Sequence, residues 1–123
     1  MKKTVCITLS LATLLLSNSI LAQDKLEFSG NCKYPNRPAA IDGSTKTEAE
    51  MITFSTRVKE FQVKGTDFLA CLDEEEGRVA ENATKDQLED FKERIDQTYN
   101  AVVDEMNASA ADFNTALRAY KNK

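Results

Sequence analysis

The chain has 123 residues, with 20 acidic and 16 basic side chains, no histidine and a net charge of −4 at pH 7. An acidic chain without a basic stripe argues against nucleic acid and anionic lipid surfaces as partners. The lack of histidine removes the usual proton-transfer group of enzymes near neutral pH, and no nucleophile-elbow, zinc-protease, phosphate-loop or dinucleotide motif is present. We therefore expect no enzymatic activity, no cofactor and no metal site.

The first 22 residues have the pattern of a secretory signal peptide. Lys2 and Lys3 precede the apolar run VCITLSLATLLL, and the segment ends in a small residue, Ala22. We expect cleavage between Ala22 and Gln23, which leaves a mature chain of 101 residues with a net charge of −6. The short, lysine-headed signal favours bacterial export to the periplasm. Because the apolar run is shorter than the ~20 residues of a membrane-spanning helix, we expect no stable membrane insertion after cleavage.

Two cysteines remain in the mature chain, since Cys6 leaves with the signal peptide. An even pair in an exported chain predicts a disulfide, here between Cys32 and Cys71. Two free thiols or a shared metal are the alternatives. The distance of 39 positions and the lack of histidine disfavour a metal.

Residues 23–46 are irregular in composition and contain both prolines of the chain, Pro35 and Pro38. We interpret this segment as an extended N-terminal strap, because proline favours an extended path. The 15 residues from Cys32 to Thr47 span up to about 50 Å when extended. Cys71 lies about 36 Å along the helix that follows. The strap can therefore reach Cys71 only if it turns back before the helix and runs nearly straight.

The turn of this strap is predicted at Asp42-Gly43. With the disulfide formed, the strap would lie in the groove between two helices. Tyr34 and Ile41 would then cover part of the apolar seam.

A helix is predicted over residues 47–80. Thr47 and Glu50 form a capping box at its start, although Thr45 and Glu48 form a competing one. Gly77 is kept inside the helix, because ending it there would crowd four acidic residues at the negative end of the helix dipole. Apolar residues recur at alternating steps of three and four, with Glu75 as the one polar interruption. The predicted seam comprises Met51, Phe54, Val58, Phe61, Gly65, Phe68, Leu72 and Val79.

A second helix is predicted over about 85–121. Thr84 and Gln87 form its capping box. The seam contains one extra step of four between Ile95 and Tyr99, which predicts a local relaxation of the supercoil. The few residues between the helices make them antiparallel neighbours, so we expect an all-α, coiled-coil-like hairpin over 47–123. The second seam comprises Leu88, Phe91, Ile95, Tyr99, Val102, Met106, Ser109 or Ala110, Phe113, Leu117 and Tyr120.

Several segments resemble an uncharacterised family of small exported proteins of Gram-negative bacteria. They are CKYPNRPAAIDG from Cys32, the pairs Glu50-Met51 and Cys71-Leu72, Val58-Lys59 with Phe61, YNAVVDEM from Tyr99 and FNTALRAYK from Phe113. The resemblance covers most of the mature chain and implies helices and a cysteine pair, but no activity. One departure is visible, since the family usually has proline before the Asp-Gly pair and here Asp42 directly follows Ile41.

Ile52, Leu69 and Val103 fall off the two seams, and we expect a two-helix hairpin to leave them exposed. They are the candidate interaction surface, for a second copy or for another periplasmic protein. The expected function is that of a non-enzymatic envelope accessory, an adaptor or chaperone-like helix pair. The alternative is a module that binds a small ligand or cation in the groove between helices and strap. The acidic run Asp73–Glu76 is interpreted as a solvated face, because helical geometry spreads its side chains around the axis.

Overall fold

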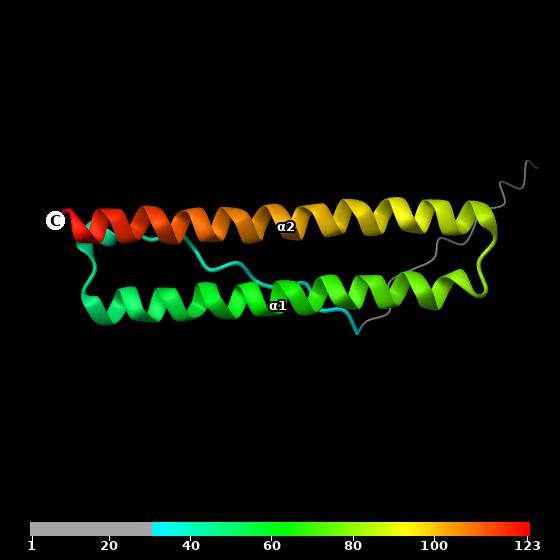
Figure 1. The fold of residues 1–123 in the computed structure, drawn as a ribbon, viewed down its shortest axis with the longest axis horizontal. Helices are drawn as coiled ribbons and strands as arrows, with labels where there is room; N and C mark the ends of the chain where they lie inside the picture. The colour runs from blue at the N-terminus through cyan, green and yellow to red at the C-terminus, as the bar shows by residue number, and fades with distance from the viewer. Residues whose placement is uncertain (1–30) are drawn as a thin grey trace, which may run out of the picture.

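Two long helices make up most of the structure. In the computed structural model, which describes residues 31–123, the short 3-10 helix η1 spans Gly43–Thr45, α1 spans Glu48–Ala80 and α2 spans Lys85–Lys121. Figure 1 shows α1 and α2 side by side and antiparallel, joined by a short turn at one end. The fold is thus an all-α hairpin, and the described part of the chain contains no strand. The expected signal peptide, its cleavage site at Ala22 and Gln23, and the first residues of the strap lie outside the described residues.

Both helices begin at a capping box. Thr47 Oγ1 accepts a hydrogen bond from the Glu50 backbone N–H at 3.3 Å, and the Glu50 carboxylate accepts one from the Thr47 N–H at 2.8 Å. Thr84 and Gln87 make the same reciprocal pair at the start of α2. Two of the unpaired N–H groups of each helix start are satisfied in this way. Of the two competing boxes, the structure uses the one at Thr47, because Thr45 belongs to η1.

The helix α1 continues through Gly77, as its sequence pattern predicts. A Cβ atom added at Gly77 would meet no atom within 4 Å, so no close contact requires glycine there. Glu75, the polar member of the seam, is buried, and its carboxylate accepts a hydrogen bond of 2.8 Å from Arg78 on the next turn. This pairing offsets part of the cost of placing a charge in an apolar seam.

The buried face of α1 is the predicted seam, but that of α2 differs from the prediction. Tyr99 is 37% exposed and Leu117 only partly buried, whereas Ala116, which the predicted seam omits, is buried. From Ile95 onward the buried residues of α2 recur every seventh position, so the helix keeps a heptad face toward α1 and places Tyr99 at its edge. The buried residues of α2 are Phe91, Ile95, Val102, Ser109 and Ala116.

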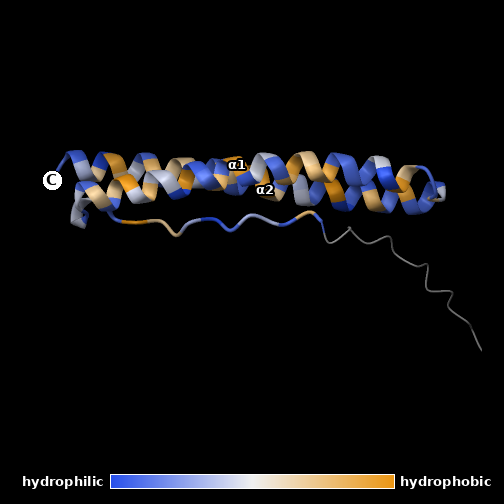
Figure 2. Ribbon diagram, turned by 90° about the horizontal axis from the view of Figure 1, so that it is seen from below, coloured by the Kyte–Doolittle hydropathy of each residue, from blue (hydrophilic) through white to orange (hydrophobic). Residues whose placement is uncertain are grey.

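The strap runs along one side of the helix pair, as Figure 2 shows. It turns at Asp42, whose side chain accepts a hydrogen bond from the Ser44 N–H at 3.0 Å. At its far end Cys32 and Cys71 lie at disulfide distance, with the Sγ atoms 1.93 Å apart. The strap is therefore anchored at both ends, which agrees with the predicted extended path from Cys32 to the turn at Asp42-Gly43.

Side chains of the strap also contact the helices between these two anchors. The Tyr34 ring packs edge-on against Phe68, with ring centroids 5.2 Å apart. Arg37 forms an ion pair of 2.6 Å with Asp112 of α2. Ile41 packs against the apolar cluster at the start of α1. The strap thus covers one side of the seam through apolar and charged contacts to both helices.

Candidate functional site

The two sides of the helix pair differ, because the strap occupies only one of them (Figures 1 and 2). Cys71 marks the strap side of α1, since it carries the disulfide. Leu69 precedes it by two residues, which is about 200° around a helix, so Leu69 faces the other side. No segment of residues 31–123 covers that side, which we call the open side.

Two contacts between the helices border the open side. The Gln62 side-chain amide donates to the Met106 carbonyl at 2.8 Å, and Lys92 pairs with Glu76 at 3.2 Å. On each helix the two contacting residues are two heptads apart, so both contacts lie on one edge of the seam. This fixes the register of the antiparallel pair along the open side.

An apolar patch lies midway between these two contacts. Leu69 on α1 and Tyr99 on α2 each lie seven residues from both contacts, which places them at the same level and on the same edge. Val103, one turn beyond Tyr99, extends the patch toward Met106, and all but Tyr99 are half-buried. Leu69 and Met106 also pack against the core cluster that contains Phe68. We call Leu69, Tyr99, Val103 and Met106 the apolar patch.

The three residues of the candidate interaction surface, Ile52, Leu69 and Val103, differ in exposure. Only Ile52 is well exposed, at 59%, because Leu69 and Val103 lie where the two helices meet. Ile52 lies on the outer face of α1 together with Val63, which is 62% exposed and eleven residues, or three turns, further along. Sequence reasoning assigned Tyr99 to the core and did not single out Val63. The exposure of Tyr99 and Val63 becomes clear only when the structure shows which edge of each helix is covered.

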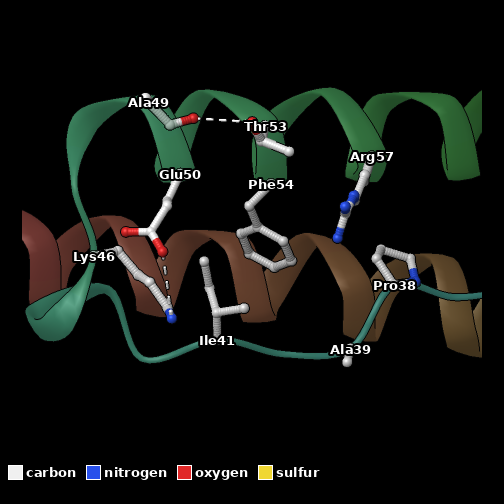
Figure 3. Close-up of a pocket in the computed structure, with 9 residues that line it drawn as sticks. All are labelled: Pro38, Ala39, Ile41, Lys46, Ala49, Glu50, Thr53, Phe54 and Arg57. Carbon is white, nitrogen blue, oxygen red and sulfur yellow. Dashed lines mark hydrogen bonds and ion pairs between the residues drawn. The ribbon is translucent and has the colours of Figure 1, made fainter.

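A cavity of about 460 Å³ lies between the strap and the first turns of α1 (Figure 3). Ile41 of the strap points toward Phe54 of α1 across this cavity. Its walls are mostly apolar, apart from a few charged side chains at its ends. The lining residues are Pro38, Ala39, Ile41, Lys46, Ala49, Glu50, Thr53, Phe54 and Arg57. We call this cavity the strap pocket.

The charged groups of the strap pocket are unevenly paired. The Glu50 carboxylate accepts hydrogen bonds from the backbone N–H and hydroxyl of Thr47, at 2.8 and 3.1 Å, and lies 3.9 Å from the Lys46 ammonium. The hydrogen bonds from Thr47 are the main reason why the pKa of Glu50 is lowered from its ordinary value. Arg57 makes no ion pair within residues 31–123. The pocket therefore combines apolar walls with one guanidinium that is not neutralised by a described residue.

A second cavity of about 460 Å³ lies beside the disulfide. It is lined by residues 31–36 of the strap and by the turn of α1 that carries Phe68 and Cys71. Burial raises the pKa of the Tyr34 phenol here, and so do the charge of Glu105 and its hydrogen bond with the phenol. The disulfide and the contact between the Tyr34 and Phe68 rings hold the strap against α1 at this cavity. We therefore assign the cavity a structural role.

Residues 31–123 contain neither a metal-binding cluster nor a membrane-spanning helix. No group of three or more acidic, histidine or cysteine side chains converges within residues 31–123, and the run Asp73–Glu76 forms no such cluster. The cation-binding part of the alternative function therefore has no supporting geometry in this part of the chain. Neither of the two long helices has an apolar stretch sufficient to cross a membrane.

The comparisons with known proteins found no relative. No family model matches the chain, and no curated protein or solved structure is significantly similar to it. The geometry of the open side and of the strap pocket is therefore the basis for inferring a function.

Proposed function

We propose that the mature protein is an exported, non-enzymatic accessory of the cell envelope that acts by binding another protein chain along the open side of its hairpin. The signal-peptide pattern of residues 1–22 and the resemblance to small exported helical proteins support the location. The partner is a second copy of this chain or another periplasmic protein.

The observation that carries this proposal is the apolar patch. Leu69, Tyr99, Val103 and Met106 come from both helices and meet on the one side that no described segment covers. Glu76 and Lys92 border the patch with a polar contact. An apolar centre with a polar border is the usual composition of a surface that receives an amphipathic helix. A further helix seated there would bury the open edge of the seam on both helices, as in a helical bundle.

Site-specific photo-cross-linking in the periplasm tests this function. A photoreactive phenylalanine replaces Tyr99, whose ring is part of the patch and is still 37% exposed. The same group at Val63, which is 62% exposed on the outer face of α1, is the matched control. We expect a discrete cross-linked species from position 99 and none from position 63. Its mass distinguishes a second copy from a different partner.

A charged residue in the patch provides the second part of the test. We expect Val103→Glu to abolish the cross-link from position 99, while Ile52→Glu leaves it unchanged, since Ile52 lies away from the patch. Circular dichroism of each variant checks that the hairpin still folds. Equal cross-linking from positions 99 and 63, or no cross-link from either, would contradict the proposal.

A further inference from the structure

The strap pocket lies apart from the open side and has features of a ligand site. Its volume of about 460 Å³ falls within the usual range of about 300–1,000 Å³ for small-molecule pockets. Phe54 contributes an aromatic ring to the wall, and Ile41 of the strap points toward it (Figure 3). Pro38 and Ala39 of the strap also line the pocket. A pocket with these walls accommodates an apolar group.

The charge at one end of the pocket determines which chemical group fits. In Figure 3 the Arg57 side chain extends from α1 toward Pro38 of the strap, at the end of the pocket away from Lys46. Arg57 has no ion-pair partner among residues 31–123, whereas Lys46 already faces Glu50. A guanidinium presents paired N–H donors that match the two oxygens of a carboxylate. We propose that the strap pocket binds an organic carboxylate with an unbranched or compact apolar body, whose head pairs with Arg57.

The position of Glu50 sets the orientation of this ligand. Glu50 lies seven residues before Arg57, two helical turns or about 10 Å away along α1. Its negative charge disfavours a second anionic group at that end, so the ligand carries one carboxylate. The apolar body of the ligand lies between Glu50 and Arg57. It packs against Phe54 and Ile41. A free fatty acid and the carboxyl-terminal end of an apolar peptide share this chemistry.

Titration of the isotope-labelled mature protein, followed by amide chemical shifts, tests the inference. The probes are decanoate below its aggregation concentration and an acetylated tri-leucine peptide with a free carboxylate. Their uncharged counterparts are decanamide and the same peptide as its amide. We expect saturable shifts at Ile41, Ala49 and Phe54 with at least one carboxylate, and binding at least threefold weaker with the amide. The probe that binds more tightly identifies the source.

Two variants and one control assign the contacts. We expect Arg57→Gln to weaken carboxylate binding about three- to tenfold, the range for a charge-assisted contact at a partly exposed site. Ala49→Leu should block the pocket while it keeps Arg57 and a good helix former. Lys59→Gln removes a cation from an exposed position that does not line the pocket, and it should leave binding unchanged.

Four results would overturn the inference. The first three are no saturable shift with either carboxylate, equal binding of acid and amide, and equal weakening by Arg57→Gln and Lys59→Gln. Shifts confined to Leu69 and Val103 on the open side would also overturn it, because the ligand would then occupy the other surface. Each variant is first melted to confirm an unchanged fold. The cross-link from position 99 does not involve this pocket, so the two proposals fail independently.

Discussion

Gly43 lies directly against the main chain of Ala116. A Cβ atom at position 43 would be 1.9 Å from the Ala116 carbonyl oxygen and 2.7 Å from its carbonyl carbon. No glycine in the described chain has a positive φ, so close approach, and not backbone conformation, requires glycine at this position. This contact docks η1 on the last turns of α2 and so sets where the strap turns back.

We predict opposite effects of alanine at Gly43 and at Gly77. Gly43→Ala forces a methyl group against the Ala116 backbone and should lower the free energy of unfolding by about 1–3 kcal/mol or more, the range for overpacking. Gly77→Ala places a methyl group in open space within a helix and should raise the free energy of unfolding by about 0.5–1 kcal/mol. Urea denaturation of both variants measures the difference. Shifts of the same sign would contradict the packing described for Gly43.

Loss of the disulfide should strongly destabilise the hairpin. The bond joins Cys32 to Cys71 across 39 positions, and closing a loop of this size contributes about 4 kcal/mol in the chain-entropy description. We expect a lower melting temperature in reductant and in the variant with both cysteines replaced by serine. The double variant should not respond further to reductant, which is the control. Wild-type protein that melts at the same temperature with and without reductant would refute the role of the strap as an anchor.

The buried hydroxyl of Ser109 should cost stability. Ser109 is only 1% exposed, and its Oγ has no hydrogen-bond partner among residues 31–123. Because an unsatisfied buried hydroxyl carries a desolvation penalty of about 1–3 kcal/mol, Ser109→Ala should leave the free energy of unfolding unchanged or raise it by up to about 1 kcal/mol.

Ser44→Ala is the matched control for this prediction. The Ser44 hydroxyl is exposed and donates to Asp42 at 2.7 Å, so its removal should destabilise the turn slightly. Guanidinium denaturation compares the two variants. A loss of more than about 1 kcal/mol in Ser109→Ala would mean that the hydroxyl is satisfied in solution.

Acid should weaken the start of α1. The pKa of the Glu50 carboxyl lies below its ordinary value of 4.5, mainly because its carboxylate accepts hydrogen bonds from Thr47. A lowered folded-state pKa favours the folded state above about pH 4.5, and this contribution is lost as the pH falls through the lower folded-state value. Carbon-detected NMR titration of the side chain measures the pKa directly.

Glu50→Gln separates this carboxylate from the others in the acid range. The amide oxygen can still accept from the Thr47 N–H, but the group no longer titrates. We expect a smaller fall in melting temperature between pH 5 and pH 3 in the variant than in the wild type. An identical acid profile would show that the capping carboxylate does not contribute.

The two helices and their antiparallel pairing could be predicted from the sequence, because capping boxes and apolar periodicity are local patterns. Each capping box lies within four residues, and the seam of α1 follows a regular three-four alternation that the structure keeps. The cysteine pair and the strap path were also predictable, because two cysteines allow one intramolecular pairing and chain length limits the route. The signal peptide and the resemblance to exported proteins remain predictions.

The exact face of α2 and the full set of residues in each candidate surface were not predictable in this way. Ala116 has no strong apolar signal, and it is buried because the heptad face of α2 turns toward α1. The predicted seam left Ser109 and Ala110 as alternatives, and the structure buries Ser109. Tyr99 looked like a core residue, yet it lies at the open edge because the strap covers only the other side.

The sequence by itself determined two helices, their antiparallel pairing and the cysteines that tie the strap, because these depend on periodicity, capping and chain reach. Only the tertiary structure decided which side the strap takes, where Gly43 meets Ala116 and which cation lines the pocket. Those features depend on contacts between residues far apart in the chain, and no local pattern encodes them. Arg57 illustrates the difference: in the sequence it is one exposed cation among many, and the strap alone makes it part of a pocket.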